Sequence, residues 1–230
     1  IQMNLVYAPT TAGQHSGTIT ITDNQARIVH TVQLSGNCLD PTIYSLPYLQ
    51  NFDAVTAPAL PVQWTTIVSS PVGTITTSTS DPQTPPNCVL MSNSSDPAAQ
   101  LVLVAPPYAN AIATNATRVK FHARSNATDQ ALQVGILTNP QDSGTFQLIQ
   151  TLNLTSTWTE FVVTFGGYTG TGKTVAFQHG LGDAYRTIYI DNVMLEFIPQ
   201  NDLAALALQG NTTPTVGVVS NYIVSVLNWG

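Results

Sequence analysis

The sequence predicts an all-β protein, and three observations lead to this fold class. Segments in which apolar and polar residues alternate recur along the whole chain, and Gly, Pro, Asn or Asp residues end them. Only 8% of the 230 residues are charged, against about 25% in typical globular domains, while Thr, Ser and Val are abundant. No segment keeps a helical period for more than two turns. We therefore expect extended strands that pack face to face.

Residues 1–38 are expected to form the last strands of a small sandwich. The stretch GTITIT (17–22) alternates Thr with Ile, and His30, Val32 and Leu34 share one face of the next strand. Residues 39–47 contain two prolines and are expected to form a linker.

The central domain is expected at residues 48–199, as a series of strands. LVLV (101–104) is a continuous apolar run of the kind found in strands that are buried on both faces. The other expected strands lie in RVKFHARS (118–125), ALQVGILT (131–138), TFQLIQTLNLT (145–155), TEFVVTFGG (159–167), TVAFQHG (174–180) and TIYIDNVMLEFIP (187–199).

Residues 200–230 are expected to begin another domain. DLAALALQG (202–210) has the length of a short helix, but Gly210 and the Thr-Pro loop that follows favour a strand and a turn. YIVSVL (222–227) is apolar on both faces of an extended strand. We expect these two strands to form the start of a sandwich.

Composition excludes several classes of function. The formal net charge is −6 and only six residues are Lys or Arg, so a nucleic-acid partner and an anionic membrane surface are both disfavoured. No apolar run approaches the about 20 residues of a membrane span. No signal peptide opens the chain, which begins like the middle of a strand, and we expect a processed or excised piece of an extracellular or cell-surface protein.

The segment FGGYTGTGKT (165–174) has the GxxxxGK[ST] spacing of a phosphate-binding P-loop. A P-loop requires a helix after Thr174, because the helix N-terminus contributes to phosphate binding. The residues that follow, VAFQHG, alternate and are rich in β-branched and aromatic side chains, which favours a strand. We therefore interpret this segment as the tip of a hairpin.

Residues from about 48 to 199 resemble the jelly-roll family of MAM-like and cleaved-adhesin domains, the "choice-of-anchor J" type of bacterial surface proteins. YLQNFDAVTAPALPVQW (48–64) looks like the opening Phe-acidic motif, and RTIYIDNVMLEF (186–197) looks like the closing strand. The resemblance implies a central jelly-roll β-sandwich. The first 38 residues look like the second half of a Hydin-type immunoglobulin-like domain, and residues 200–230 are similar to the first strands of a CARDB-like domain.

Two half-domains would leave open cores and unpaired strand edges. One hypothesis is that the tail strands of one subunit complete the head strands of the next, which would propagate as a filament. The alternative is that the chain was cut from a longer multi-domain protein and that its ends pack on the jelly roll.

Asp191 is the most informative acidic residue. Counting by twos places it on one face with Tyr189, Val193 and Leu195, and a carboxylate on such a face needs a partner. The family resemblance implies a structural calcium ion held by Asp53 and Asp191. The alternative is that backbone amides of a turn or bulge satisfy Asp191.

The stretch RVKFHARS places Arg118, Lys120, His122 and Arg124 on one face of a strand. Such a stripe could receive an acidic glycan or an acidic partner subunit. It is also typical of a solvated sheet face.

Tyr108, Tyr168 and Tyr185 lie in turn-like sequence and are candidates for stacking on a sugar ring. They support the rival hypothesis, a carbohydrate-binding module of a secreted protein.

Cys38 and Cys88 could pair as a disulfide in an oxidising compartment or remain inert thiols. Catalysis is not expected, because no nucleophile has a recognisable partner and the histidines are scattered at positions 15, 30, 122 and 179.

Overall fold

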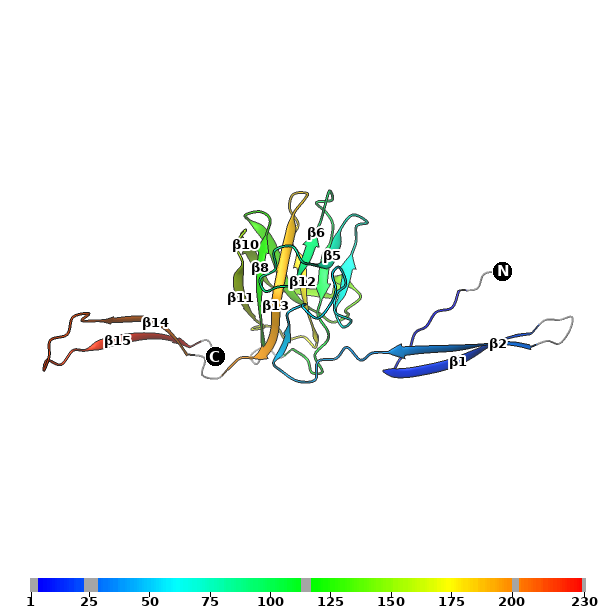
Figure 1. Cartoon of the computed structure of the whole chain (residues 1–230), viewed down its shortest axis with the longest axis horizontal. Coiled ribbons are helices and arrows are strands. Elements are labelled where there is room, and N and C mark those ends of the chain that lie inside the picture. Colours follow the sequence, from blue (N-terminus) through cyan, green and yellow to red (C-terminus); the bar gives the residue numbers. More distant parts are fainter. Residues whose placement is uncertain (1–3, 23–28, 113–116, 200–202, 229–230) are drawn as a thin grey trace. The chain divides into compact units, whose positions relative to one another are not determined.

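The structure is a computed structural model that describes residues 4–22, 29–112, 117–199 and 203–228. The regular secondary structure of the described residues is almost all strand, and its one helical element is the 3-10 turn η1 (Ser143–Thr145). A central jelly-roll β-sandwich is preceded and followed in the sequence by a two-stranded hairpin (Figure 1), which confirms the predicted fold class. The chain divides into two units, Ile1–Thr42 and Ile43–Gly230.

One layer of the sandwich is a five-stranded antiparallel sheet in the order β10-β9-β12-β7-β4. Strand β7, which lies between β12 and β4, is buried on both faces, as its continuous apolar run predicts. Leu101 and Leu103 face the main core, whereas Val102 and Val104 join a second cluster that Phe146 partly covers. The strands are β4 (Thr65–Val68), β7 (Leu101–Val104), β9 (Gln130–Leu137), β10 (Phe146–Leu154) and β12 (Thr174–His179).

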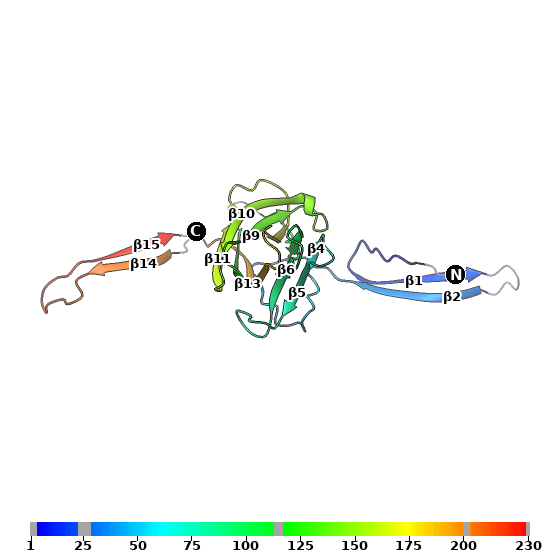
Figure 2. The same ribbon diagram turned by 90° about the horizontal axis from the view of Figure 1, so that it is seen from above.

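The other layer is a six-stranded antiparallel sheet in the order β11-β8-β13-β6-β5, with β3 paired to one end of β13. Seen from above, β9 and β10 lie on one side of the sandwich and β5 and β6 on the other (Figure 2). The strands are β3 (Tyr48–Gln50), β5 (Thr74–Ser78), β6 (Cys88–Ser92), β8 (Thr117–Ser125), β11 (Thr159–Thr164) and β13 (Thr187–Phe197).

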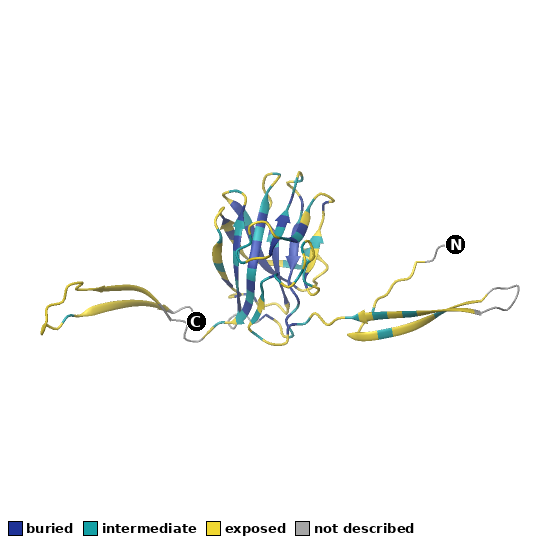
Figure 3. Ribbon diagram, viewed as in Figure 1, coloured by how far each residue is buried: buried dark blue, intermediate teal, exposed yellow. Residues whose placement is uncertain are grey.

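The core fills the space between the two sheets, and buried residues concentrate there (Figure 3). Phe121 of β8 and Phe177 of β12 join the layers, with ring centroids 5.0 Å apart in an edge-to-face arrangement. Phe52 and Trp64 form a second edge-to-face pair at 5.1 Å. Such pairs add about 0.5–1.5 kcal/mol to the burial of their rings.

The P-loop-like segment is a connection between the two layers. Residues 165–173 run from β11 of one sheet to β12 of the other, so the hairpin interpretation was wrong, whereas the strand expected after Thr174 is present as β12. Tyr168 is buried, and its hydroxyl accepts a hydrogen bond from the Gly172 backbone N–H at 2.6 Å. Lys173 Nζ donates to the Ala109 carbonyl. The segment therefore encloses its own tyrosine and lacks the helix that phosphate binding requires.

The N-terminal hairpin is amphipathic. Strands β1 (Gly13–Thr22) and β2 (Val29–Cys38) pair Ile19 with Val32 and Gly17 with Leu34, which places these side chains on one face. Thr, Ser, Gln and Asn residues occupy the other face. Since a clean alternation is typical of a sheet with one buried face, the apolar face requires a cover.

The C-terminal hairpin has a similar face. Strands β14 (Leu203–Gly210) and β15 (Tyr222–Asn228) pair Leu208 with Val224, and Tyr222 and Val226 alternate onto the same side. All four side chains remain 49–69% exposed. An isolated two-stranded sheet is marginally stable at best in water, so this hairpin also requires a covering layer.

Candidate functional site

Strand β13 changes its neighbour along its length, and this change creates a gap in the sheet. Residues 187–190 pair with β6, whereas residues 193–195 pair with β3. Asp191 and Asn192 lie between the two paired segments, and Asn192 adopts a left-handed backbone with φ 52°. The register with β8 shifts at the same point. The strand therefore contains a β-bulge at the gap between β3 and β6.

The bulge corrects the predicted orientation of Asp191. Counting by twos places Asp191 on the same face as Val193, but Ile190 and Val193 both belong to the core. Asp191 shares the opposite, outer face of the sheet with Tyr189. It is nevertheless fully buried, because the loop that precedes β6 covers it.

The carboxylate of Asp191 is held by backbone amides. Its Oδ2 accepts from the Thr84 N–H at 3.0 Å, and its Oδ1 accepts from the Asn192 N–H at 2.7 Å. The Asn192 side-chain amide donates to Gln83 Oε1 at 2.6 Å and so fastens the covering loop. This agrees with the alternative that a bulge satisfies Asp191 through backbone amides.

Asp53 lies at the same gap, shortly after β3 ends. Its Oδ1 accepts from the Asn87 backbone N–H at 3.1 Å, and its Oδ2 accepts from Asn51 Nδ2 at 2.7 Å. Asn87 immediately precedes β6, and its side chain donates to the Val55 carbonyl at 2.8 Å. Asp53 and Asn87 therefore tie the end of β3 to the start of β6.

Burial is the main influence on the charge of Asp191. Burial raises the pKa of this carboxyl, the Thr84 and Asn192 backbone N–H groups lower it, and the negative charge of Asp53 raises it again. In the part of the chain that the structure describes, no cationic side chain forms a salt bridge with Asp53 or Asp191. Among the described residues, amide groups therefore hold the two carboxyl groups of the gap.

Asp53 and Asp191 are the residues of this gap that would hold a hard divalent cation such as calcium. The two carboxylates accept hydrogen bonds from surrounding amides, and calcium takes carboxylate, carbonyl and amide oxygens. The described residues contain no group of three His, Cys, Asp or Glu side chains that could hold a metal. A cation at Asp53 and Asp191 would therefore need main-chain or amide oxygens as further ligands.

The basic stripe on β8 is neutralised by acids of neighbouring strands. Arg118 Nε lies 2.8 Å from Glu196 Oε1 of β13, and Lys120 Nζ lies 3.8 Å from Glu160 Oε1 of β11. Lys120 also approaches Glu196, at 4.0 Å. These charges are already paired within the sheet, which weighs against an acidic ligand and agrees with the alternative of a structural sheet face.

Arg124 is held more tightly than the other members of the stripe. Its guanidinium carbon lies 4.0 Å from the centroid of the Tyr189 ring and 5.5 Å from that of Trp158, and its Nη2 is 2.6 Å from Asp81 Oδ2. Trp158 Nε1 also donates to the Asp81 carbonyl. The cluster fixes the loop before β6, so Arg124 is a structural residue in this arrangement.

The three candidate tyrosines have different surroundings. Tyr168 and Tyr108 are 1% and 7% exposed and belong to the main core, so their rings cannot stack on a sugar in the folded protein. These two predictions are corrected for this physical reason: their connecting loops fold inward against the sheets. Tyr185 is 68% exposed and stays a candidate.

Both cysteines are free thiols in the structure, and they belong to different units of the chain. Cys88 is fully buried at the start of β6, and its Sγ lies 3.8 Å from the Ser78 carbonyl oxygen. Burial raises the pKa of its thiol to about 12, and the negative charge of Asp191 acts in the same direction. Cys88 therefore behaves as a small buried apolar residue.

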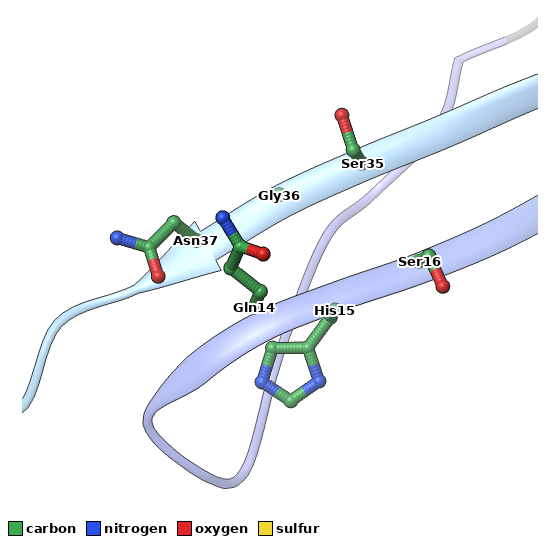
Figure 4. Close-up of a pocket in the computed structure, with 6 residues that line it drawn as sticks. All are labelled: Gln14, His15, Ser16, Ser35, Gly36 and Asn37. Atoms are coloured by element: carbon green, nitrogen blue, oxygen red, sulfur yellow. The ribbon is translucent and has the colours of Figure 1, made fainter.

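Three shallow hollows lie on the described part of the N-terminal unit, and two of them border the hairpin strands along their length. The larger, of about 520 Å³, is lined mainly by polar residues, and Gln14, Ser35 and Asn37 lie along it (Figure 4). The other, of about 360 Å³, lies between residues 5–7 and the apolar face of the hairpin. Tyr7 closes one end of it by resting on Gly36, where a Cβ atom would lie 2.7 Å from the Tyr7 ring.

Several residues of the gap could not be found from sequence. Thr84 and Asn87 reach Asp191 and Asp53 from more than 30 positions away in the chain, and no motif marks them among the many Thr and Asn residues. The residue type of Asn192 is a partial signal, because Asn adopts the positive φ observed there more readily than most residues.

The described residues include no helix long and apolar enough to cross a membrane.

Comparison with known proteins relates the sandwich to solved structures. No protein-family model matches the sequence, and no curated protein does. The K2 cleaved adhesin domain of Lys-gingipain is 17% identical with a TM-score of 0.53, over 65% of this chain and 97% of that domain. The K1 domain, from Porphyromonas gingivalis W83, gives 17% and 0.51, over 66% and 98%.

A structure described as carbohydrate-binding modules of the β-sandwich superfamily also matches, with 16% identity and a TM-score of 0.46 over 84% of this chain and 77% of that one. At these identities the likeness to the cleaved adhesin domains concerns the fold. The central sandwich is therefore a cleaved-adhesin-like β-sandwich.

Proposed function

We propose that this protein is a non-catalytic β-sandwich component of an extracellular or cell surface, and that it self-associates head to tail through its two hairpins. The observation that supports self-association is that both hairpins keep exposed apolar side chains on one face, among them Ile21, Val32, Leu208 and Val224. Neither residues 4–22 and 29–39 nor residues 203–228 contain a single Asp, Glu, Lys or Arg. Soluble proteins usually protect exposed strands with charge, especially Lys, and these strands have none.

Both hairpins carry branched apolar side chains on one face. The N-terminal hairpin offers Ile19, Ile21, Val32 and Leu34, and the C-terminal hairpin offers Leu208, Tyr222, Val224 and Val226. Packed face to face, two such sheets form the layers of a small sandwich about 10 Å apart. Contact between the head of one copy and the tail of the next leaves a free head and a free tail, so it propagates.

The apolar faces supply a modest driving force. Complete burial of such a side chain contributes about 1.5–3 kcal/mol, so covering the exposed half of the six most exposed side chains gives about 5–9 kcal/mol before losses. Association costs about 4–15 kcal/mol in lost translational and rotational freedom. We therefore expect assembly that depends on protein concentration.

Two aspartate variants test the head-to-tail contact. Val32→Asp places a charge on the head face and Val224→Asp on the tail face, while Thr31→Asp and Ser225→Asp place the same charge on the opposite faces as controls. Light scattering after size exclusion should show polymers for the unaltered chain and both controls, and monomers for each Val variant alone. An equal mixture of the two Val variants should give a one-to-one dimer, because one intact head can bind one intact tail.

Two results would contradict this proposal. One is a monomeric unaltered chain at every concentration, with dispersed single particles in electron micrographs. The other is a mixture of the Val variants that stays monomeric, since that would exclude a contact between unlike faces.

The gap between β3 and β6 supports a structural calcium ion on Asp53 and Asp191. The chain's own residues supply two carboxylates and a rigid set of surrounding amides, and the cation would supply the missing positive charge. A ligand that binds only the folded state raises stability, so a chelator should lower the melting temperature. An unchanged melting temperature would contradict the calcium proposal alone.

Glycan binding is the second candidate function, and the exposure of Tyr185 is the observation that favours it. With Tyr108 and Tyr168 in the core, Tyr185 is what remains of the three aromatic candidates. Retention on a glycan surface without polymers would favour this candidate over self-association.

A further inference from the structure

Tyr185 combines backbone strain with solvent exposure. Its φ of 61° lies in the left-handed region, which is an outlier for a bulky residue. Phe52 has the same φ, but its side chain is fully buried against Trp64, so core packing compensates for the strain. The side chain of Tyr185 supplies no such packing, since it is 68% exposed. Strain that packing does not explain is typical of residues held in place for a ligand.

Hydrogen bonds from two other loops fix the backbone of Tyr185. Its N–H donates to the Ser94 carbonyl, and its carbonyl accepts from Asn126 Nδ2 at 2.8 Å. The Asn126 Oδ1 atom accepts from the Thr187 N–H at 2.9 Å. Both main-chain polar groups of Tyr185 are thus committed, one to each loop.

A buried asparagine secures the residues on either side. Asn93 is 1% exposed; its Nδ2 donates to the Asp183 carbonyl at 2.9 Å, and its Oδ1 accepts from the Arg186 N–H at 2.8 Å. The buried His179 ring lies between the carbonyls of Gly180 and Arg186, which mark the two ends of the loop. The loop is therefore anchored along its length, and Tyr185 is presented without freedom to relax.

The chemistry of the loop indicates what it would bind. A tyrosine ring offers a flat apolar face with a hydroxyl at its edge, which suits the C–H face and hydroxyl rim of a sugar ring. Asp183 and Arg186 of the same loop form an ion pair and supply planar acceptor and donor groups without net charge. The chain as a whole carries a formal charge of −6, which disfavours an acidic ligand.

The geometry points to a binding site for a neutral glycan on the loop 180–186, with the Tyr185 ring as the stacking surface and Asp183 and Arg186 as its polar rim. Asn93 and Asn126 are positioning residues that hold the loop from neighbouring turns. This inference deepens the glycan-binding candidate of the preceding subsection and is independent of the hairpin contact.

An array of neutral oligosaccharides tests the site, followed by calorimetric titration of the oligosaccharide with the strongest signal. Tyr185→Ala should lower the affinity at least tenfold, whereas Tyr185→Trp, which keeps an aromatic face, should retain it within about threefold. Tyr44→Ala is the matched control, because Tyr44 is another tyrosine with 70% exposure, and it should bind as the unaltered chain does. Val32→Asp should also bind normally, which separates this site from assembly.

Three results would overturn the inference. They are the absence of binding to every neutral oligosaccharide on the array, an unchanged affinity in Tyr185→Ala, and an equal loss in Tyr44→Ala. Polymer formation by the hairpins would remain measurable in each case, so the two proposals fail separately.

Discussion

Replacing Phe52 and Tyr185 by glycine should change stability in opposite directions, although the two residues share the same left-handed backbone. Glycine adopts φ above zero at no steric cost, so each substitution relieves about 1–2 kcal/mol of strain. Glycine also raises the conformational entropy of the unfolded chain, which lowers the free energy of unfolding by about 0.5–1 kcal/mol. These two effects are common to both positions.

Burial separates the two variants. Tyr185 is 68% exposed and little packing is lost with it, so Tyr185→Gly should raise the free energy of unfolding by about 0.5–1 kcal/mol. Phe52 is fully buried, with its ring centroid 5.1 Å from that of Trp64, and removal of such a side chain costs about 3–5 kcal/mol. Phe52→Gly should therefore lose about 3 kcal/mol net. The two variants should differ by about 4 kcal/mol.

Urea denaturation measures this difference as a shift in midpoint at constant slope. Because assembly would also raise apparent stability, both substitutions are best made in the Val32→Asp background. A Tyr185→Gly variant that loses stability would refute the argument that Tyr185 is strained without compensating side-chain packing. Equal losses at both positions would have the same consequence.

Two further predictions follow from the buried titratable groups. The pKa of Asp191 is raised above its ordinary 3.8, so the folded state binds its proton more tightly than the unfolded state. With a chelator present, the free energy of unfolding should therefore fall as the pH rises from 3.8 through the raised folded-state pKa of Asp191. Urea titrations at several pH values measure this slope, and Asp191→Asn should remove it. A slope of opposite sign would contradict the assignment to Asp191. Cys88 is fully buried and its thiol has a pKa of about 12. Iodoacetamide at neutral pH should therefore modify Cys38 and leave Cys88 unmodified in the native protein, and it should modify both thiols in urea. Mass spectrometry measures the extent of modification at each cysteine. Equal native labelling would contradict the burial of Cys88.

The sequence by itself determined where most strands lie. Alternation is a local property of the chain, and it predicts the paired strands of the N-terminal hairpin and the strand after Thr174 without reference to any other segment. The continuous run LVLV likewise predicts a strand buried on both faces, as β7 is. The polar composition and the scarcity of charge indicated a β-protein before any pairing was known.

Only the tertiary structure decided which residues meet. Strand β13 takes β6 and β3 as successive neighbours, and the bulge between them turns Asp191 away from Val193, which no periodicity along β13 reveals. The acids that neutralise the β8 stripe come from strands distant in sequence, and loop packing alone separates buried Tyr168 from exposed Tyr185. The physical reason is that alternation reports on one strand, whereas pairing, burial and charge neutralisation depend on contacts between segments far apart in the chain.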